Sequence, residues 1–465
     1  MDFERVHNRF TTLAAVCCLG LLLWAEPLRA EESIDQSEPI PSSVDEVTGP
    51  LEQLGEVKFR RLPRVLPWIK GQLKDAPAFF RDTTMDLSVR SYYSRASKYD
   101  GTTISEAWAL GGALNYRSGW LLDRVSVGAS LYTSQPLYAP AGSGGSGVLQ
   151  PDQSGITVLG QLYGRIKLTD QVVANLYRYA DYKTPYLSKD DGKIIPYSFE
   201  GYFVKGTLGE TGGAPQLVFG GGYFTKIKDK TSENFIWMSE KAGATVKRGV
   251  SVLGGLYTAG RFSLGAVDYY SNDIINIGYT EGSFTKDLDN GLGIRLAAQF
   301  TDQRSVGSEL LTGTGFSTNQ FGVKSDLSYA GAILTLAYTL NSRGYDLQKP
   351  WSGYPGFTSA MINNYKGAGY NAWYAKVSYD FSESGLEGVA AYALVTHGWG
   401  QVDQVTKAPL PGENELNADI QWRPKLAYLT GLRLRVRYGL AHQYEGAKQY
   451  SRDGRVMVTY DFPLM

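Results

Sequence analysis

Three arginines alternate with apolar residues near the C-terminal end of the sequence and form its clearest chemical signal. Residues 431–438 read GLRLRVRY, so Arg433, Arg435 and Arg437 occupy every second position. Successive side chains of a strand point to opposite faces, so the three guanidinium groups share one face at steps of about 7 Å. Cations at this spacing can pass a carboxylate along a pore, because each site attracts the anion without holding it permanently.

Further charges occupy similar positions in other segments. The basic candidates are Arg295, Lys324 and Lys376, and the acidic candidates are Asp326, Asp380 and Asp419. Acidic groups that face a basic row would produce a transverse field that orients a zwitterion. The alternative is that these charges only pair with one another. Like charges on one strand face repel each other, so three arginines would not share a face unless a function needed them; for these three we therefore favour conduction. For any single Asp or Lys we favour pairing.

Alternation of this kind runs through most of the chain and predicts the elements that position these side chains. The face opposite the arginines carries Leu432, Leu434, Val436 and Tyr438. A membrane barrel turns such an apolar face to hydrocarbon and the polar face to its lumen. We therefore predict an all-β, antiparallel transmembrane barrel. Its eighteen strands are expected near 83–93, 104–117, 122–133, 156–168, 171–182, 196–208, 215–227, 249–259, 261–271, 274–285, 291–302, 319–329, 331–341, 371–382, 387–397, 414–423, 431–442 and 452–462.

The composition excludes several other classes of protein. The chain has 54 Gly and 32 Tyr among 465 residues, and its mean hydropathy is −0.24. No segment after residue 30 has the roughly eighteen continuous apolar residues that indicate a membrane-spanning helix. The 46 basic and 46 acidic residues balance, so the bulk charge gives no reason to expect a nucleic-acid partner. These features fit a transmembrane barrel or a large secreted β protein, and the alternation favours the barrel, in the outer membrane of a Gram-negative cell.

Residues 1–30 are expected to be a cleaved signal peptide. Basic residues precede an apolar stretch from Phe10 to Trp24, and Ala30 offers a small residue at the cleavage site. This stretch, at about fifteen residues, is shorter than the roughly twenty that cross a bilayer as a helix. Cys17 and Cys18 would leave with it. The mature chain is therefore expected to contain no disulfide and no cysteine metal site.

Residues 31–80 differ in composition from the barrel expected over 81–465. They are first acidic and rich in Ser and Pro, and then basic with apolar residues between the charges. We interpret them as a periplasmic segment, disordered at first, whose basic half is an interfacial helix, a strap near the barrel mouth or a solvated leader. We expect this segment to be dispensable for barrel closure. Long and short connections alternate, which predicts extracellular loops, periplasmic turns and both termini in the periplasm.

Several segments resemble the OprD family of outer-membrane porins. They are 87–95 (LSVRSYYSR), 184–201, 350–359, 372–393, 412–422 and 431–438. The resemblance extends over 81–465 and implies a narrow, substrate-selective channel of eighteen strands, with inward-folded loops and a ladder of basic residues along the lumen wall. Two features depart from the family. Residues 31–80 have no counterpart that we recognise, and the chain ends Pro-Leu-Met after Phe462.

The resemblance also implies roles for particular positions. Arg433, Arg435 and Arg437 match the family's basic run on the penultimate strand, and residues 183–195 and 342–370 correspond to its inward-folded third and seventh loops. By resemblance alone, the constriction candidates are Tyr186, Ser188, Lys189, Asp190 and Asp191. The implied function is passive uptake of small nutrients such as carboxylates and amino acids. Besides these solutes, we expect outer-membrane lipid, lipopolysaccharide and the barrel-assembly machinery as partners.

Two other functions are alternatives. An outer-membrane barrel hydrolase (lipase or protease) would use a Ser or Asp at the barrel lip with His397 or His442, but such barrels usually have fewer strands. An adhesive or structural barrel would fill its inner face with bulky apolar residues, whereas this sequence places Gly, Ser, Thr, Arg and Asn there. No Glu/His spacing for zinc occurs, and the glycine-rich residues 142–147 precede no helix. We therefore expect no enzyme activity, no metal and no cofactor.

Overall fold

The computed structural model describes residues 65–209, 215–426, 429–444 and 449–465. The chain divides into two units, Met1–Glu46 and Val47–Met465, and the described residues belong to the second. The expected signal peptide and the first part of the expected periplasmic segment lie outside the described residues.

Eighteen long strands occupy the segments in which the alternation predicted them. They are β1 (Thr84–Ser97), β2 (Ile104–Arg117), β3 (Val125–Tyr138), β4 (Ile156–Thr169), β5 (Val172–Tyr179), β6 (Ser198–Leu208), β7 (Gln216–Lys228), β9 (Val250–Ala259), β10 (Phe262–Ser271), β11 (Ile275–Asp287), β12 (Gly293–Arg304), β13 (Ser317–Tyr329), β14 (Ala332–Asn341), β15 (Asn371–Asp380), β16 (Val389–Trp399), β17 (Glu413–Trp422), β18 (Leu432–Gln443) and β19 (Gln449–Pro463). A short additional strand, β8 (Phe235–Trp237), pairs with β7. The alternation could not reveal β8, because three residues are too few to show a period.

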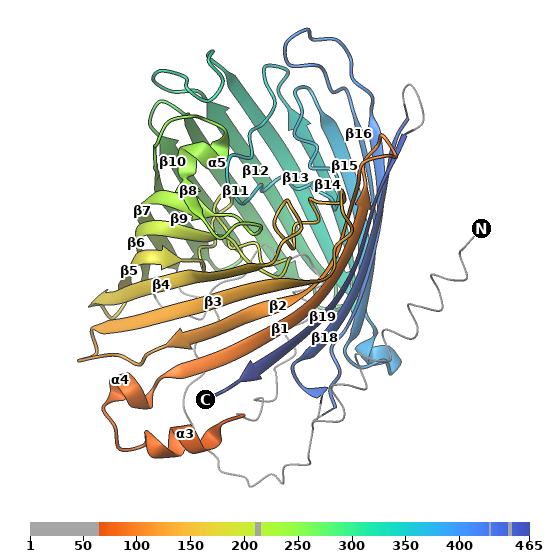
Figure 1. Ribbon diagram of the computed structural model, residues 1–465. Coiled ribbons are helices and arrows are strands. Elements are labelled where there is room, and N and C mark those ends of the chain that lie inside the picture. The colour runs from red at the N-terminus through yellow and green to blue at the C-terminus, as the bar shows by residue number, and fades with distance from the viewer. Residues whose placement is uncertain (1–64, 210–214, 427–428, 445–448) are drawn as a thin grey trace. The chain divides into compact units, whose positions relative to one another are not determined.

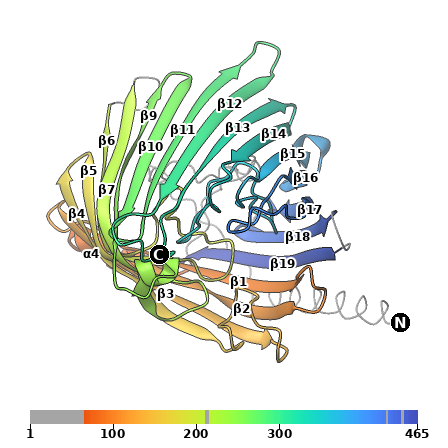
Figure 2. The same ribbon diagram turned by 90° about the horizontal axis from the view of Figure 1, so that it is seen from above.

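The sheet closes on itself (Figures 1 and 2). All pairings are antiparallel. Strand β7 pairs with β9 as well as with the short β8, and β1 pairs with both β2 and β19. In the closing pair, Val89 lies opposite Tyr460 and Arg90 opposite Thr459. A closed antiparallel sheet satisfies the backbone hydrogen bonds of every strand, which a bilayer requires. The prediction of an eighteen-stranded barrel is confirmed.

The two faces of the wall differ as the alternation predicts. On β18, the side chains of Val436 and Tyr438 are exposed on the outer face, whereas those of the arginines between the apolar residues are partly buried. Many other large apolar side chains are exposed along the strands, including Leu253, Leu264 and Phe300. Such a surface fits hydrocarbon, and the polar face lines the interior.

Loops at one end of the barrel are longer than the turns at the other. Residues 139–155, 180–197 and 342–370 (loop 2, loop 3 and loop 7) are long connections, and Figure 2 shows the blue-green segment between β14 and β15 inside the ring of strands. Not every loop at this end is long: β10 and β11 are joined by residues 272–274 alone. The first described residues and the C-terminal residues lie at the other end, where backbone hydrogen bonds join Val65 to Pro463 and Leu66 to Leu464. This end faces the periplasm.

Among the described residues, four short helices lie before the first strand or in connections between strands. They are α3 (Pro67–Gln72), α4 (Ala78–Arg81), α5 (Met238–Ala242) and the 3₁₀ helix η1 (Phe381–Ser384). Helix α5 lies in the connection between β7 and β9 and ends at Gly243, whose φ of 112° suits glycine. In the part of the chain that the structure describes, no helix has the length and apolar character needed to span a bilayer.

Candidate functional site

Two of the predicted arginines share one carboxylate on the neighbouring strand. Asp419 lies opposite Arg437 in the β17–β18 register, and its side chain is 0% exposed. Arg435 donates from Nε and Nη2 to the two carboxylate oxygens at 2.8 to 3.0 Å. Arg437 Nε lies 2.7 Å from Asp419 Oδ2 as an ion pair without hydrogen-bond alignment, and its Nη2 donates to the hydroxyl of Tyr392 at 3.0 Å. One carboxylate for two guanidinium groups leaves a net positive charge.

The basic row continues across two further strands. Arg433 lies in the same cross-strand row as Arg90 of β1, with one residue of β19 between them. Arg437 lies opposite Arg455 of β19, which forms an ion pair of 2.5 Å with Asp453. The sequence interpretation missed Arg90 and Arg455. Their positions on the polar face of alternating strands were the signal that could have identified them.

Lys376 on β15 approaches the same region of the lumen. Its side chain is buried, and Nζ lies 5.4 Å from the ring centre of Tyr392 and 5.9 Å from that of Tyr374. Asp326 lies in the same cross-strand row, separated from Lys376 by Thr335 of β14. The hydroxyl of Thr335 donates to Asp326 Oδ1 at 2.6 Å. Acidic and basic groups therefore alternate along this part of the wall.

The remaining predicted charges have local partners. Lys324 Nζ lies 4.5 Å from the ring centre of Phe357 in loop 7, and Arg295 Nη2 lies 3.8 Å from Glu281 Oε1. Asp380 is the last residue of β15, and its carboxylate accepts the backbone N–H of the second residue of η1 at 2.9 Å. Asp380 therefore caps a turn at the strand end and does not join the lumen charges around Lys376.

A cavity of about 200 Å³ brings three of the predicted cations together. It lies between the wall and loop 7. Its lining residues are Ser359, Ala360, Met361, Tyr374, Lys376, Tyr392, Leu394, Asn417, Arg435 and Arg437. Three cationic side chains can bind a carboxylate, and the tyrosines and aliphatic side chains can contact an apolar body.

A carboxylate on β17 holds loop 7 against this cavity. Glu415 accepts the backbone N–H groups of Ile362 and Asn363, each at 2.8 Å. The amide oxygen of Asn417 accepts the N–H of Met361 at 3.1 Å. Hydrogen bonds from backbone N–H groups to a carboxylate are stronger than those between neutral groups. The wall therefore determines where the loop residues that line the cavity lie.

Loop 3 is anchored by the residue first expected to narrow the pore. Tyr186 is fully buried; its ring lies edge-to-face with Tyr269 at 5.5 Å, and its hydroxyl accepts a hydrogen bond from Gln303 at 3.0 Å. The resemblance placed Tyr186 at the constriction, but its side chain packs against the wall and is not free to line the pore. The N–H of Ser188 donates to the hydroxyl of Ser352 at 2.9 Å, which joins loop 3 to loop 7.

The other constriction candidates form ion pairs near the tip of loop 3. Lys189 Nζ lies 3.3 Å from Asp181 and 3.9 Å from Asp191. Asp190 forms a hydrogen-bonded ion pair with Lys230 of the next long connection. Burial would raise the pKa of Asp190, but the charge and hydrogen bond of Lys230 outweigh it, so this pKa is below its usual range. The pairs of Lys189 thus lie within loop 3, whereas the pair of Asp190 attaches the loop to the next long connection.

Arg90 connects the tip of loop 3 to the wall. Its guanidinium donates to the backbone carbonyls of Asp191, at 2.6 Å, and of Lys193. Lys193 Nζ in turn donates to the carbonyl of Ser146 in loop 2 at 3.0 Å. Burial, reinforced by the positive charge of Arg455, lowers the pKa of Lys193 well below its usual value. Loops 2 and 3 and strand β1 therefore form one connected unit.

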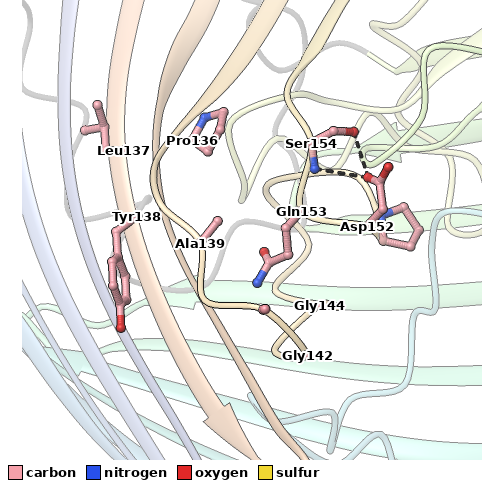
Figure 3. A pocket seen from close by; sticks show the side chains of 11 residues that line it. Pro136, Leu137, Tyr138, Ala139, Gly142, Gly144, Asp152, Gln153 and Ser154 are labelled. Carbon is pink, nitrogen blue, oxygen red and sulfur yellow. Dashed lines mark hydrogen bonds between the residues drawn. The ribbon is translucent and has the colours of Figure 1, made fainter.

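A larger cavity, of about 770 Å³, lies in loop 2 and the end of β3 (Figure 3). Of the residues that line it, Asp152 alone is charged, and it accepts hydrogen bonds from the backbone N–H and hydroxyl of Ser154 at 3.0 and 2.7 Å (Figure 3). The other lining residues include prolines, glycines and alanines. None of the predicted site residues lines this cavity, so we do not assign it to the conduction path.

The two histidines of the barrel are placed among aromatic side chains. His397 Nδ1 lies 2.8 Å from Asn414 Oδ1, and its ring stacks on that of Tyr444 at 5.2 Å. His442 stacks on Tyr450 at 4.7 Å. Such groups are typical of the belt at a membrane interface. Among the residues that the structure describes, no group of three or more His, Cys, Asp or Glu side chains could hold a metal ion.

A closed barrel with an apolar exterior, charges along the lumen and loops folded inward defines an outer-membrane channel. The chain belongs to the OprD family of outer membrane porins, whose family model matches residues 77–464. The family and the fold both indicate a channel and not an enzyme. No curated protein matches the sequence.

Solved structures of porins share the fold. OccK9 (OpdG) of Pseudomonas aeruginosa has a TM-score of 0.73 and 20% identity, and the match covers 83% of this chain and all of that one. OpdK of the same organism, solved with vanillate, has a TM-score of 0.71 and 17% identity at coverages of 83% and 100%. A BenF-like porin from Pseudomonas fluorescens Pf-5 has a TM-score of 0.72 and 16% identity, also at 83% and 100%.

Proposed function

We propose that this porin admits small organic carboxylates to the periplasm by passive diffusion, and that the cavity beside Arg435, Arg437 and Lys376 is where the carboxylate binds on its way. The juxtaposition of these three cations in one lumen cavity is the observation that carries the proposal. Two arginines and one lysine contribute three positive charges, of which Asp419 neutralises one. An anion entering the cavity therefore meets a net positive charge.

The site must also release its solute. Arg435 and Arg437 are already paired with Asp419, so an incoming carboxylate shares guanidinium donors with a resident one and is held less firmly than by unpaired cations. Arg433 and Arg90 extend the basic row past the paired arginines. Successive weak sites of this kind favour passage over retention.

Amino acids are a second class of solute that the wall suits. Asp326 lies two strands from Lys376 in one cross-strand row, so negative and positive groups occupy neighbouring positions. A zwitterion can place its carboxylate near the basic residues and its ammonium group near the acidic one.

OpdK, a neighbour in fold, was solved with vanillate, which is a carboxylate of the first class of solute proposed here.

The test replaces the arginines by glutamine. In Arg435→Gln/Arg437→Gln, reversal potentials in planar bilayers should shift toward cation preference. Carboxylate uptake into proteoliposomes should fall about tenfold, which corresponds to roughly 1.4 kcal/mol of lost interaction. Because the double variant strips Asp419 of its partners, a triple variant that adds Asp419→Asn separates loss of function from loss of folding.

The matched control is Arg304→Gln, since Arg304 is exposed at the end of β12 and paired with Asp302 outside the cavity. It should leave selectivity and uptake unchanged. If both lumen variants give heat-modifiable, folded protein with unchanged selectivity and unchanged uptake of every carboxylate tested, the arginines are structural and the proposal is wrong.

A further inference from the structure

The helical segment ahead of the first strand has chemistry that conduction does not use. Residues 65–76 precede the part of the chain that the family model matches. Trp68 of α3, in this range, is 60% exposed. Phe80 of α4, shortly after it, is 52% exposed. A large exposed indole and phenyl ring are unfavourable in water and common where a protein meets the headgroup region of a bilayer.

The segment is fixed at the periplasmic rim of the barrel. Backbone hydrogen bonds of 3.0 and 2.9 Å join Val65 and Leu66 to the last residues of the chain. The carbonyl of Phe79 accepts the N–H of Gly119, in the turn between β2 and β3, at 2.9 Å. Figure 1 shows α3 and α4 beyond the lower ends of β1 to β3.

Gly119 is where the close contact with α4 is made. A Cβ added at this position would lie 2.1 Å from the carbonyl oxygen of Ala78 and 2.9 Å from Cβ of Asp82. The backbone of α4 therefore rests directly on the turn. Leu121 and Leu122 of the same turn are also exposed, so the rim next to α4 presents further apolar side chains.

Basic residues accompany the apolar ones. Residues 65–82 contain three basic residues, Lys70, Lys74 and Arg81, and two acidic ones, Asp75 and Asp82. In the described part, Lys70 Nζ donates to the carbonyl of Arg81 at 2.9 Å, which joins α3 to the end of α4. Polybasic segments next to a membrane bind anionic lipid headgroups, and exposed aromatic rings insert beside them.

We propose that residues 65–82 form an interfacial anchor that binds the anionic phospholipids of the periplasmic leaflet and secures the rim at the seam where β1 meets β19. The occupant is a lipid surface, because the segment combines exposed aromatic rings, one more basic than acidic residue and a position at the periplasmic rim of the wall. An acidic polymer such as peptidoglycan would match the charge but would not require the exposed Trp68 and Phe80. The anchor is independent of the solute that the channel carries.

The test uses the full chain in vesicles with brominated acyl chains. The difference in fluorescence quenching between the wild-type protein and Trp68→Phe isolates the contribution of Trp68. Quenching of Trp68 should be at least twofold stronger in vesicles that contain phosphatidylglycerol than in vesicles of phosphatidylcholine alone. Lys70→Gln/Lys74→Gln should abolish this difference between the two lipids.

A second variant addresses the position of the segment without changing its chemistry. Gly119→Leu should displace α4, and hydrogen exchange of residues 65–82 in phosphatidylglycerol nanodiscs should then be faster than in the wild type. The matched control is Gly260→Leu, in a turn where a Cβ would meet no atom within 4 Å; its positive φ strains that turn but leaves α4 in place. Heat modifiability on gels verifies that each variant has folded.

Three outcomes would overturn the proposal. The first is no quenching of Trp68 by either lipid in folded protein. The second is equal quenching in the two lipids, which would remove the recognition of anionic headgroups. The third is protection of residues 65–82 by purified peptidoglycan but not by phosphatidylglycerol, which would assign the segment to the polymer.

Discussion

Asp419 is the residue that pairs with two of the three cations lining the lumen cavity. Its buried carboxylate contacts both Arg435 and Arg437. Without it, two guanidinium groups would lie side by side on one face of β18 with no negative charge between them. The same contact reduces the positive charge that an anion meets. In the function proposed above, Asp419 would therefore contribute to stability and weaken the binding of anions, as a channel that must release its solute requires.

Replacing Asp419 by asparagine separates these effects. Asp419→Asn should increase anion selectivity in planar bilayers, because the cavity gains one net positive charge. It should also lower the free energy of unfolding by roughly 1–3 kcal/mol, since buried donors lose their partner. Asp302→Asn, which breaks the more exposed pair with Arg304, should cost less than about 1 kcal/mol and leave selectivity unchanged. Unchanged selectivity in folded Asp419→Asn would show that this carboxylate does not control the charge that the solute meets.

We propose that loops 3 and 7 are the elements that narrow the channel. Loop 7 is held by Glu415 on β17, and loop 3 by Arg90, by buried Tyr186 and by the pair between Asp190 and Lys230. Each attachment joins a loop to the wall or to another long connection. Those attachments that depend on a carboxylate can be broken by acid, so a channel narrowed by these loops would respond to pH.

The pair between Asp190 and Lys230 should make loop 3 sensitive to acid. The pKa of Asp190 is lowered in the folded protein, so its stabilising effect is complete above the ordinary pKa of an aspartate and is lost as the pH falls through the lowered value. Single-channel conductance should change as the pH is lowered through this acidic window. Asp190→Asn should show the acid conductance at neutral pH and lose the transition. A transition that persists unchanged in this variant would have to come from another group.

In the whole molecule, closure of the barrel rests on the strands themselves. The pairing of β1 with β19 extends from Asp86 opposite Pro463 to Ser97 opposite Arg452. Residues 65 and 66 add two backbone hydrogen bonds beyond it, and α4 rests on one turn. These contacts secure the rim after the ring is already complete.

Deletion of residues 31–80 should therefore leave a closed barrel. The shortened protein should give a heat-modifiable folded band and normal single-channel conductance, with a lower melting temperature, because the contacts at the rim are lost. Wild-type protein refolded in parallel is the reference. Absence of a folded band would mean that the segment is needed for closure, against our expectation.

The sequence by itself determined the barrel, its number of long strands and the alternation of two faces along each strand. Strand side chains alternate with a period of two, and a bilayer requires opposite chemistry on the two faces of the wall. A short segment such as 431–438 therefore shows by itself both that it is a strand and which of its faces is apolar. The same reasoning could have identified Arg90 and Arg455. Sequence alone could not reveal β8 or α5, which are too short to show a period.

Only the tertiary structure decided which charges meet and which residues line the cavity beside loop 7. The pairing of Asp419 with two arginines depends on the register between β17 and β18, and alternation within one strand does not specify a register with its neighbour. Tyr186 packs against residues far from it in the chain, and Glu415 accepts hydrogen bonds from loop 7, more than fifty residues before it. Such contacts exist only after closure brings the wall around the loops, because loop sequences carry no period that predicts their path.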